Sequence, residues 1–227
     1  KANISYANYD LQAPMGSICK FRYSNIEQYG KASPIIKSKK LYTHNMKVNL
    51  FKYPEKVIGI SWRGGGKGHR LKQKSMSIES FTQVLKYQKA SYVSLQYGCS
   101  DKDIKEFKAN GVDVHFDQSV DALKDMERWL EQVNSCDGVL SVANTTIHGA
   151  GGLGVPTLCM LSNLSDWRWL SDDRIKQSYW YPTVGIQRQK KNGSWDDAII
   201  NAKEWISNSC ENPKGPYFLE SDVTDKY

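Results

Sequence analysis

The sequence predicts an α/β fold: a Rossmann-like parallel sheet of about six strands with helices on both faces. From about residue 56 onward, short apolar and β-branched runs alternate with longer amphipathic stretches, which is typical of successive strand and helix units. The 227 residues include 7 Trp, 13 Tyr and 6 Phe, which is enough bulky apolar surface for a substantial core. A disordered chain is therefore excluded, and no apolar run approaches the ~20 residues that would span a bilayer.

Six short apolar runs are the predicted strands. They are centred on residues 57–60, 92–95, 112–114, 139–142, 157–160 and 184–186.

The predicted helices between these strands have recognisable caps and apolar stripes. One begins after Ser75 or Ser77, and a second begins at Ser100, where Asp103 three residues later completes a capping box. Further inward stripes follow at helical spacing, in the stretches 78–85, 121–134 and 195–206. Their members are Ile78, Phe81 and Leu85, then Leu123, Met126, Leu130 and Val133, and finally Ile199, Ala202 and Ile206.

Charge and hydrophobic periodicity divide the chain into a basic N-terminal segment and a periodic remainder. Residues 1–74 contain 15 Lys and Arg against 3 Asp and Glu, whereas the remainder contains 16 against 21. Residues 1–55 show no sustained period and are predicted to be a basic connector or the remnant of an N-terminal domain. Residues 56–210 form the Rossmann-like domain, and 211–227 a C-terminal tail. The basic excess is either a solvated surface or a site for an anionic partner.

The cysteine and histidine spacings point away from disulfides and metals. The five cysteines are dispersed and never form a C-x-x-C pair, which favours a reducing compartment. The four histidines also lack metal-ligand spacing, so we expect no bound transition metal.

The loop after the first strand is rich in glycine and positive charge. It reads SWRGGGKGHRLKQKS from Ser61 to Ser75 and matches neither the Walker nor the G-x-G-x-x-G pattern. Glycines allow close backbone approach and the cations would neutralise phosphate, so the loop is either a phosphate site or a flexible basic turn.

The loop after the fourth strand reads ANTTIHGAGGLGVPT. Asn144, Thr145 and Thr146 are predicted to cap a helix whose N–H groups and dipole suit a diphosphate, although such residues also cap purely structural helices. His148 lies one turn further on, where it is either a packing residue or part of a site. The aromatic segments DWRWL and SYWYP are core packing or sugar platforms.

In order, the segments IGISWRGG, KSMSIESF, YVSLQYG, SCDGVLSVANTTIHGAGGLGVPT, DWRWL and SYWYP resemble the C-terminal half of GT-B glycosyltransferases. The likeness is to the heptosyltransferase type, in the branch associated with tetratricopeptide repeats, and more distantly to protein O-GlcNAc transferases. It covers roughly residues 56–207. The resemblance implies one half of a GT-B fold that holds a nucleoside-diphosphate sugar.

The resemblance assigns roles to three groups of residues. It implies that the donor diphosphate is bound by Ser61, Arg63, Lys74, Thr145 and Thr146. Donor-sugar contacts fall on Asn144 and His148. The base-side loop falls on Gln96, Tyr97 and Gly98.

The resemblance also implies a mechanism. The sugar would transfer with inversion by direct displacement at its anomeric carbon, without a metal or other cofactor, while the protein stabilises the leaving nucleoside diphosphate. Heptosyltransferases usually have Asp at the position of Asn144, which leaves the donor open. The family's general base lies in the N-terminal domain, so we assign no catalytic residue here.

These expectations describe a hexosyl- or heptosyl-transferring enzyme. Its acceptor would be a glycan, a lipid-linked molecule or a protein, and its partner an N-terminal GT-B half or a repeat domain. We expect a cytoplasmic location, at the inner membrane surface or away from it, with no transmembrane segment and no specific nucleic acid. The alternative is a non-catalytic GT-B-like module that uses its basic N-terminal third for a polyanionic partner.

Overall fold

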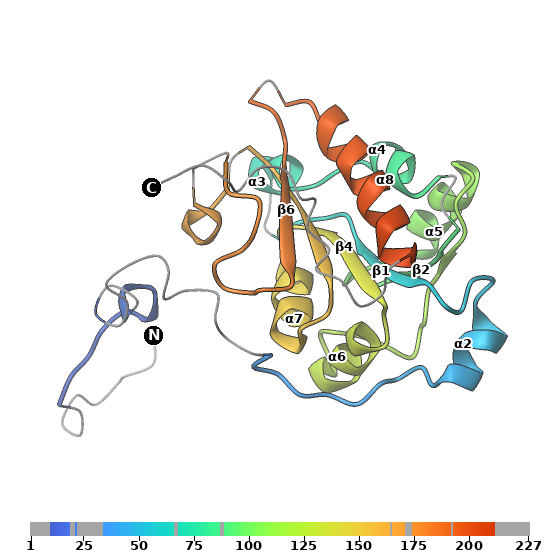
Figure 1. The fold of residues 1–227 in the computed structure, drawn as a ribbon, viewed down its shortest axis with the longest axis horizontal. Coiled ribbons are helices and arrows are strands. Elements are labelled where there is room, and N and C mark those ends of the chain that lie inside the picture. The colour runs from blue at the N-terminus through green and yellow to red at the C-terminus, as the bar shows by residue number, and fades with distance from the viewer. Residues whose placement is uncertain are drawn as a thin grey trace.

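The computed structural model describes residues 10–18, 21, 34–65, 68–86, 89–163, 165–170, 174–191 and 193–211. Six parallel strands form one sheet in the order β3-β2-β1-β4-β5-β6 (Figure 1). They are β1 (Val57–Ser61), β2 (Ser91–Ser94), β3 (Val114–His115), β4 (Gly138–Val142), β5 (Thr157–Leu161) and β6 (Val184–Arg188). This confirms the predicted Rossmann-like class, with the third strand two residues later than expected.

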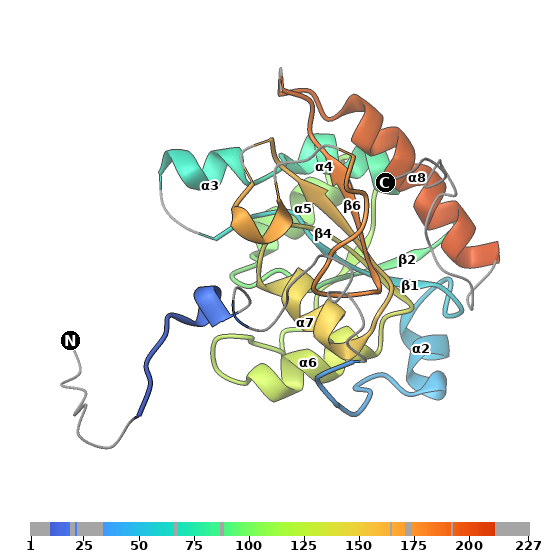
Figure 2. The same ribbon diagram turned by 60° about the vertical axis from the view of Figure 1, so that its left-hand side comes forward.

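Helices cover both faces of the sheet (Figures 1 and 2). One face carries α4 (Ile78–Leu85), α5 (Asp101–Ala109) and α8 (Asp196–Glu211), and the other carries α6 (Met126–Asn134) and α7 (Thr145–Leu153). Smaller elements are α2 (His44–Leu50), α3 (His69–Gln73) and the 3-10 turns η2 (Met15–Ser17) and η4 (Trp167–Trp169).

The core follows from the alternation of side chains along each strand. On β1, Ile58 and Ile60 pack in the cluster that includes α4, α5 and α8, whereas Val57 packs with Trp129 and Val133 of α6. Every residue of β1, β2, β4 and β5 is buried, as expected of a parallel sheet covered on both faces.

The described segment 34–55, before β1, packs against the domain. The N–H groups of Ile35 and Ile36 donate to the Gly152 carbonyl at 2.8 and 2.9 Å. Lys47 Nζ lies 2.9 Å from both carboxylate oxygens of Asp137. The predicted domain limit at residue 55 therefore falls inside a packed part of the described chain.

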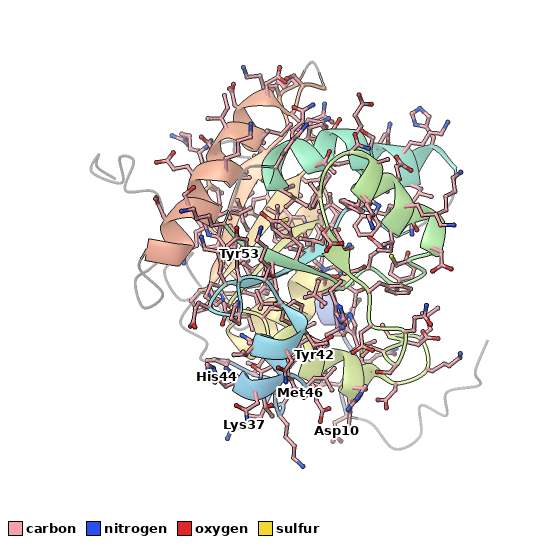
Figure 3. The ribbon with its side chains drawn as sticks, turned by 90° about the vertical axis from the view of Figure 1, so that its right-hand side faces the viewer. Asp10, Lys37, Tyr42, His44, Met46 and Tyr53 are labelled. Atoms are coloured by element: carbon pink, nitrogen blue, oxygen red, sulfur yellow. The ribbon has the colours of Figure 1, made fainter. Side chains whose placement is uncertain are left out.

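Tyr42, in the same segment, forms a buried polar contact. Its hydroxyl donates to Asp117 Oδ2 at 3.1 Å and accepts from Gln132 Nε2 at 2.7 Å, and its side chain is 2% exposed. Figure 3 faces this side of the molecule and labels Tyr42 together with His44 and Met46 of α2.

The sequence prediction of the helix over 121–134 was wrong at its start. The Asp121 side chain accepts from the N–H of Leu123 in a turn, and Asp125 caps α6 by accepting from the N–H of Arg128. Leu123 and Met126 are consequently 78% and 48% exposed instead of buried.

Other helix predictions are confirmed or refined. Ser77 is the N-cap of α4, Ser100 and Asp103 form the expected capping box, and α8 begins soon after Ser194. The C-terminal tail after Glu211 lies outside the described residues. No helix of the described chain combines the length and apolar composition needed to cross a bilayer.

Candidate functional site

A pocket of about 370 Å³ lies at the carboxyl ends of the strands, between the loops that follow β1, β2, β4 and β5. Strands β1 and β4 are neighbours, and the chain leaves them toward opposite edges of the sheet. Open α/β sheets bind ligands at such a switch point. Side chains that line the pocket include Lys74, Tyr97, Asn144, Thr145, Thr146, His148, Asp166 and Trp169.

Gln96 ties the ends of β1 and β2 together. Its Oε1 accepts from Ser61 Oγ at 3.0 Å and from the N–H groups of Trp62 and Arg63 at 3.2 and 2.8 Å. The side chain is 5% exposed, and its Nε2 donates to the Tyr97 carbonyl. The structure thus places Gln96 and Ser61 beneath the loops, where they fix the backbone at the pocket edge.

Asn144 makes the corresponding link between β1 and β4. Its Nδ2 donates to Ser61 Oγ at 2.7 Å and to the Arg63 carbonyl at 2.9 Å. Its Oδ1 accepts from the Thr146 N–H at 2.8 Å, which caps α7 and settles which end of the amide is the oxygen. An aspartate could not donate these two hydrogen bonds.

The Arg63 side chain is not among those that line the pocket, and it bonds residues of the β2 loop and α5. Its guanidinium bonds the two carboxylate oxygens of Asp103 at 2.9 and 3.3 Å and donates to the Gly98 carbonyl at 2.9 Å. The Asp103 side chain is 11% exposed. A fork-to-carboxylate pair in this setting holds the β1 and β2 loops together, and the predicted diphosphate contact would require it to open.

The glycine-rich loop turns back to place Lys74 at the pocket. The Gly64 N–H donates to Ser75 Oγ at 3.0 Å, and a Cβ at Gly64 would lie 2.7 Å from the Cβ of Lys74. Lys74 Nζ lies 4.0 Å from Asp166 Oδ2 across the pocket. Gly66, Lys67 and the side chain of Arg70, which belong to the predicted basic loop, lie outside the described residues.

The N-terminus of α7 opens into the pocket at Thr145 and Thr146. The first N–H groups of a helix have no partner within it, and the dipole adds partial positive charge there. Gly149 allows α7 to approach α6, because a Cβ there would lie 2.9 Å from the Trp129 ring. Lys74, Thr145 and Thr146 line the same pocket.

His148, on α7, contacts two aromatic side chains from the segments between β5 and β6. Its Nδ1 lies 3.0 Å from Tyr181 Oη, and its ring stacks on Trp169 at 5.9 Å between centroids. Tyr181 packs so closely on α7 that a Cβ at Gly151 would lie 2.5 Å from its ring. Burial lowers the pKa of the His148 imidazole, Arg168 lowers it further, and Asp166 offsets part of the effect. His148 is thus neutral at pH 7 and able to donate or accept a hydrogen bond.

Because the pKa of His148 is lowered in the folded protein, acidification should reduce the free energy of unfolding. A histidine whose folded pKa lies below its unfolded value of about 6.5 binds its proton more readily unfolded, so stability present above that pH falls as the pH drops below it. We expect His148→Gln to lose less stability than the wild type between pH 7.5 and 5.5 in urea unfolding. The exposed His44→Gln is the matched control, and equal pH dependence in all three proteins would contradict the assignment.

The base-side loop forms an apolar wall of the pocket. Tyr97 is 38% exposed, and Gly98 adopts a left-handed φ of 62° that turns the chain after it. The exposed Leu123 and Met126 line the same pocket and add to its apolar surface. Their helical spacing predicts a core position for both side chains, and the sequence signal against it is the pair Asp121 and Asp125, which favour a turn and a helix N-cap.

No protein-family model and no curated protein matches the chain. Among solved structures, the chain is similar to the glycosyl transferase family 9 protein from Veillonella parvula DSM 2008, with a TM-score of 0.39 and 14% sequence identity. The match covers 66% of this chain and 38% of that one, so the chain spans well under half of that protein's length.

Proposed function

We propose that this chain is the donor-binding domain of a glycosyltransferase that uses a nucleoside-diphosphate sugar. The main support is one pocket in which Lys74, the N-terminus of α7 and an apolar wall meet at the switch point of the sheet. Positive groups at one end and an apolar wall at the other match the two halves of a nucleoside diphosphate.

In this proposal the diphosphate lies against Lys74 and the Thr145–Thr146 turn, and the base lies along the wall near Tyr97. His148, half-buried at the pocket and with a lowered pKa, is suited to a hydroxyl of the donor sugar. Asn144 contributes by position, since its amide is already bonded to Ser61, Arg63 and Thr146.

The chemistry proposed is direct displacement at the anomeric carbon with inversion. The bond from that carbon to the diphosphate oxygen breaks as the acceptor oxygen attacks from the opposite side, and its proton passes to a base outside the described residues. Negative charge grows on the leaving diphosphate, where Lys74 and the α7 dipole stabilise it. These groups supply the positive charge, so we propose a donor bound without a metal ion or other cofactor.

The proposal extends to the class of sugar and of acceptor. A hexosyl or heptosyl group would pass to a glycan, a lipid-linked molecule or a protein. That acceptor would be held mainly by an N-terminal GT-B half or a repeat domain.

The test is calorimetry and thermal unfolding with UDP, GDP, ADP and CDP. A ligand that binds only the native state raises its stability by about 2.7 kcal/mol at 100 times Kd, so one nucleotide should stand out as a higher melting temperature. A polyanion such as heparin serves as the comparison. Binding to heparin with indifference to all four nucleotides would overturn the proposal in favour of a polyanion-binding module.

A further inference from the structure

Asp166 stands between two cations at the pocket. Its Oδ2 lies 4.0 Å from Lys74 Nζ and 3.6 Å from Arg168 Nη1. Its other oxygen accepts from the Arg168 N–H at 3.0 Å, which caps the η4 turn and fixes the carboxylate in place. Figure 2 shows α3, which precedes Lys74, and the η4 turn at the same end of the sheet. Two cations from separate loops therefore converge on one carboxylate.

These two ion pairs are loose. Both exceed hydrogen-bond distance, and the side chains of Lys74, Asp166 and Arg168 are 32%, 36% and 41% exposed. Exposed ion pairs of this kind contribute little to stability. A diphosphate that comes within hydrogen-bond distance of Lys74 and Arg168 could therefore replace the carboxylate at little cost. The Arg63–Asp103 pair differs, because it is a 2.9 Å fork on a nearly buried carboxylate.

Arg168 lies next to two residues that line the pocket, Asp166 and Trp169, and aromatic side chains hold it there. Its guanidinium lies 4.6 Å from the centroid of the Trp167 ring, and its carbonyl accepts from Trp180 Nε1 at 2.9 Å. The segments DWRWL and SYWYP therefore do more than pack, because together they position Arg168 and Asp166 beside the pocket.

We propose that Asp166 is the internal counter-ion of the donor site, and that a diphosphate displaces it from Lys74 and Arg168. Arg168 is then the second phosphate-binding cation, a role that the sequence did not assign. This inference rests on the proposed function. When the nucleoside diphosphate departs, the side chains of Lys74 and Arg168 return to the carboxylate, whose competition for them assists the release. Asp166 therefore weakens the complex and speeds dissociation of the nucleoside diphosphate.

Asp166→Asn isolates the charge, because the amide oxygen still caps the Arg168 N–H. We expect this variant to bind whichever of UDP, GDP, ADP and CDP the wild type binds about 3- to 10-fold more tightly, with slower dissociation. The corresponding nucleoside without phosphate should bind unchanged. Arg168→Gln should bind the diphosphate more weakly. Asp197→Asn, which removes a carboxylate paired with Lys190 at 2.8 Å on α8, is the matched control.

The outcomes separate the two proposals. Wild-type protein that binds none of the four nucleotides would overturn the proposed function and this inference together. Normal wild-type binding, with Asp166→Asn folded by thermal unfolding and no tighter than Asp197→Asn, would overturn the counter-ion role alone. Should Asp166→Asn not fold, unchanged diphosphate affinity in a folded Arg168→Gln would reject the inference equally.

Discussion

Replacing Asn144 by Asp should lower the free energy of unfolding by about 1–3 kcal/mol. The amide donates to Ser61 Oγ and to the Arg63 carbonyl, and a carboxylate would lose both bonds and place negative charge 2.9 Å from a carbonyl oxygen. The dipole of α7 favours a carboxylate at its N-cap by about 0.3–1 kcal/mol, which offsets only part of the cost. Urea unfolding at pH 7 measures the difference.

The matched control is Asn49→Asp, at an exposed position on α2 where little change is expected. The heptosyltransferases that the sequence resembles usually have Asp at the position of Asn144. The substitution therefore also tests whether this fold needs the hydrogen bonds that an amide donates there. If Asn144→Asp were as stable as the wild type or more stable, the hydrogen bond from Asn144 to the Arg63 carbonyl would not contribute to stability.

Combining Lys74→Met with Thr146→Val should weaken nucleoside-diphosphate binding by about 100-fold. The lysine supplies a charge-assisted contact and the threonine a hydroxyl, and losing about 1.5 kcal/mol for each gives roughly two powers of ten. Both changes keep the side-chain volume, so the pocket walls should survive. Calorimetry with the nucleotide selected by the panel measures the loss.

Two comparisons sharpen this test. Lys39→Met, at an exposed position before α2, should leave the affinity unchanged apart from a small salt-sensitive effect. The nucleoside without phosphates should bind wild type and double variant alike. Undiminished diphosphate affinity in the folded double variant would reject this placement of the phosphates, whatever the chain's function.

Much of the fold could be predicted from the sequence, because local chemistry decides it. Short apolar runs specified the parallel strands, and the Ser77, Ser100 and Asn144 caps lie where their side chains accept the first N–H groups of helices. The family resemblance implied a shared site for Lys74, Thr145 and Thr146, and all three line one pocket at the carboxyl ends of the strands.

The tertiary structure decided which polar side chains are left for a ligand. Ser61, Arg63, Gln96 and Asn144 look alike in sequence as polar loop residues, yet partners 33 to 83 positions away along the chain engage them. Leu123 and Met126 have helical spacing, but two aspartate caps turn them out to the pocket. The periodicity of a sequence depends only on residues that are close along the chain. The competition for hydrogen bonds and charge across the sheet, as between Asp166, Lys74 and Arg168, exists only once the loops are brought together.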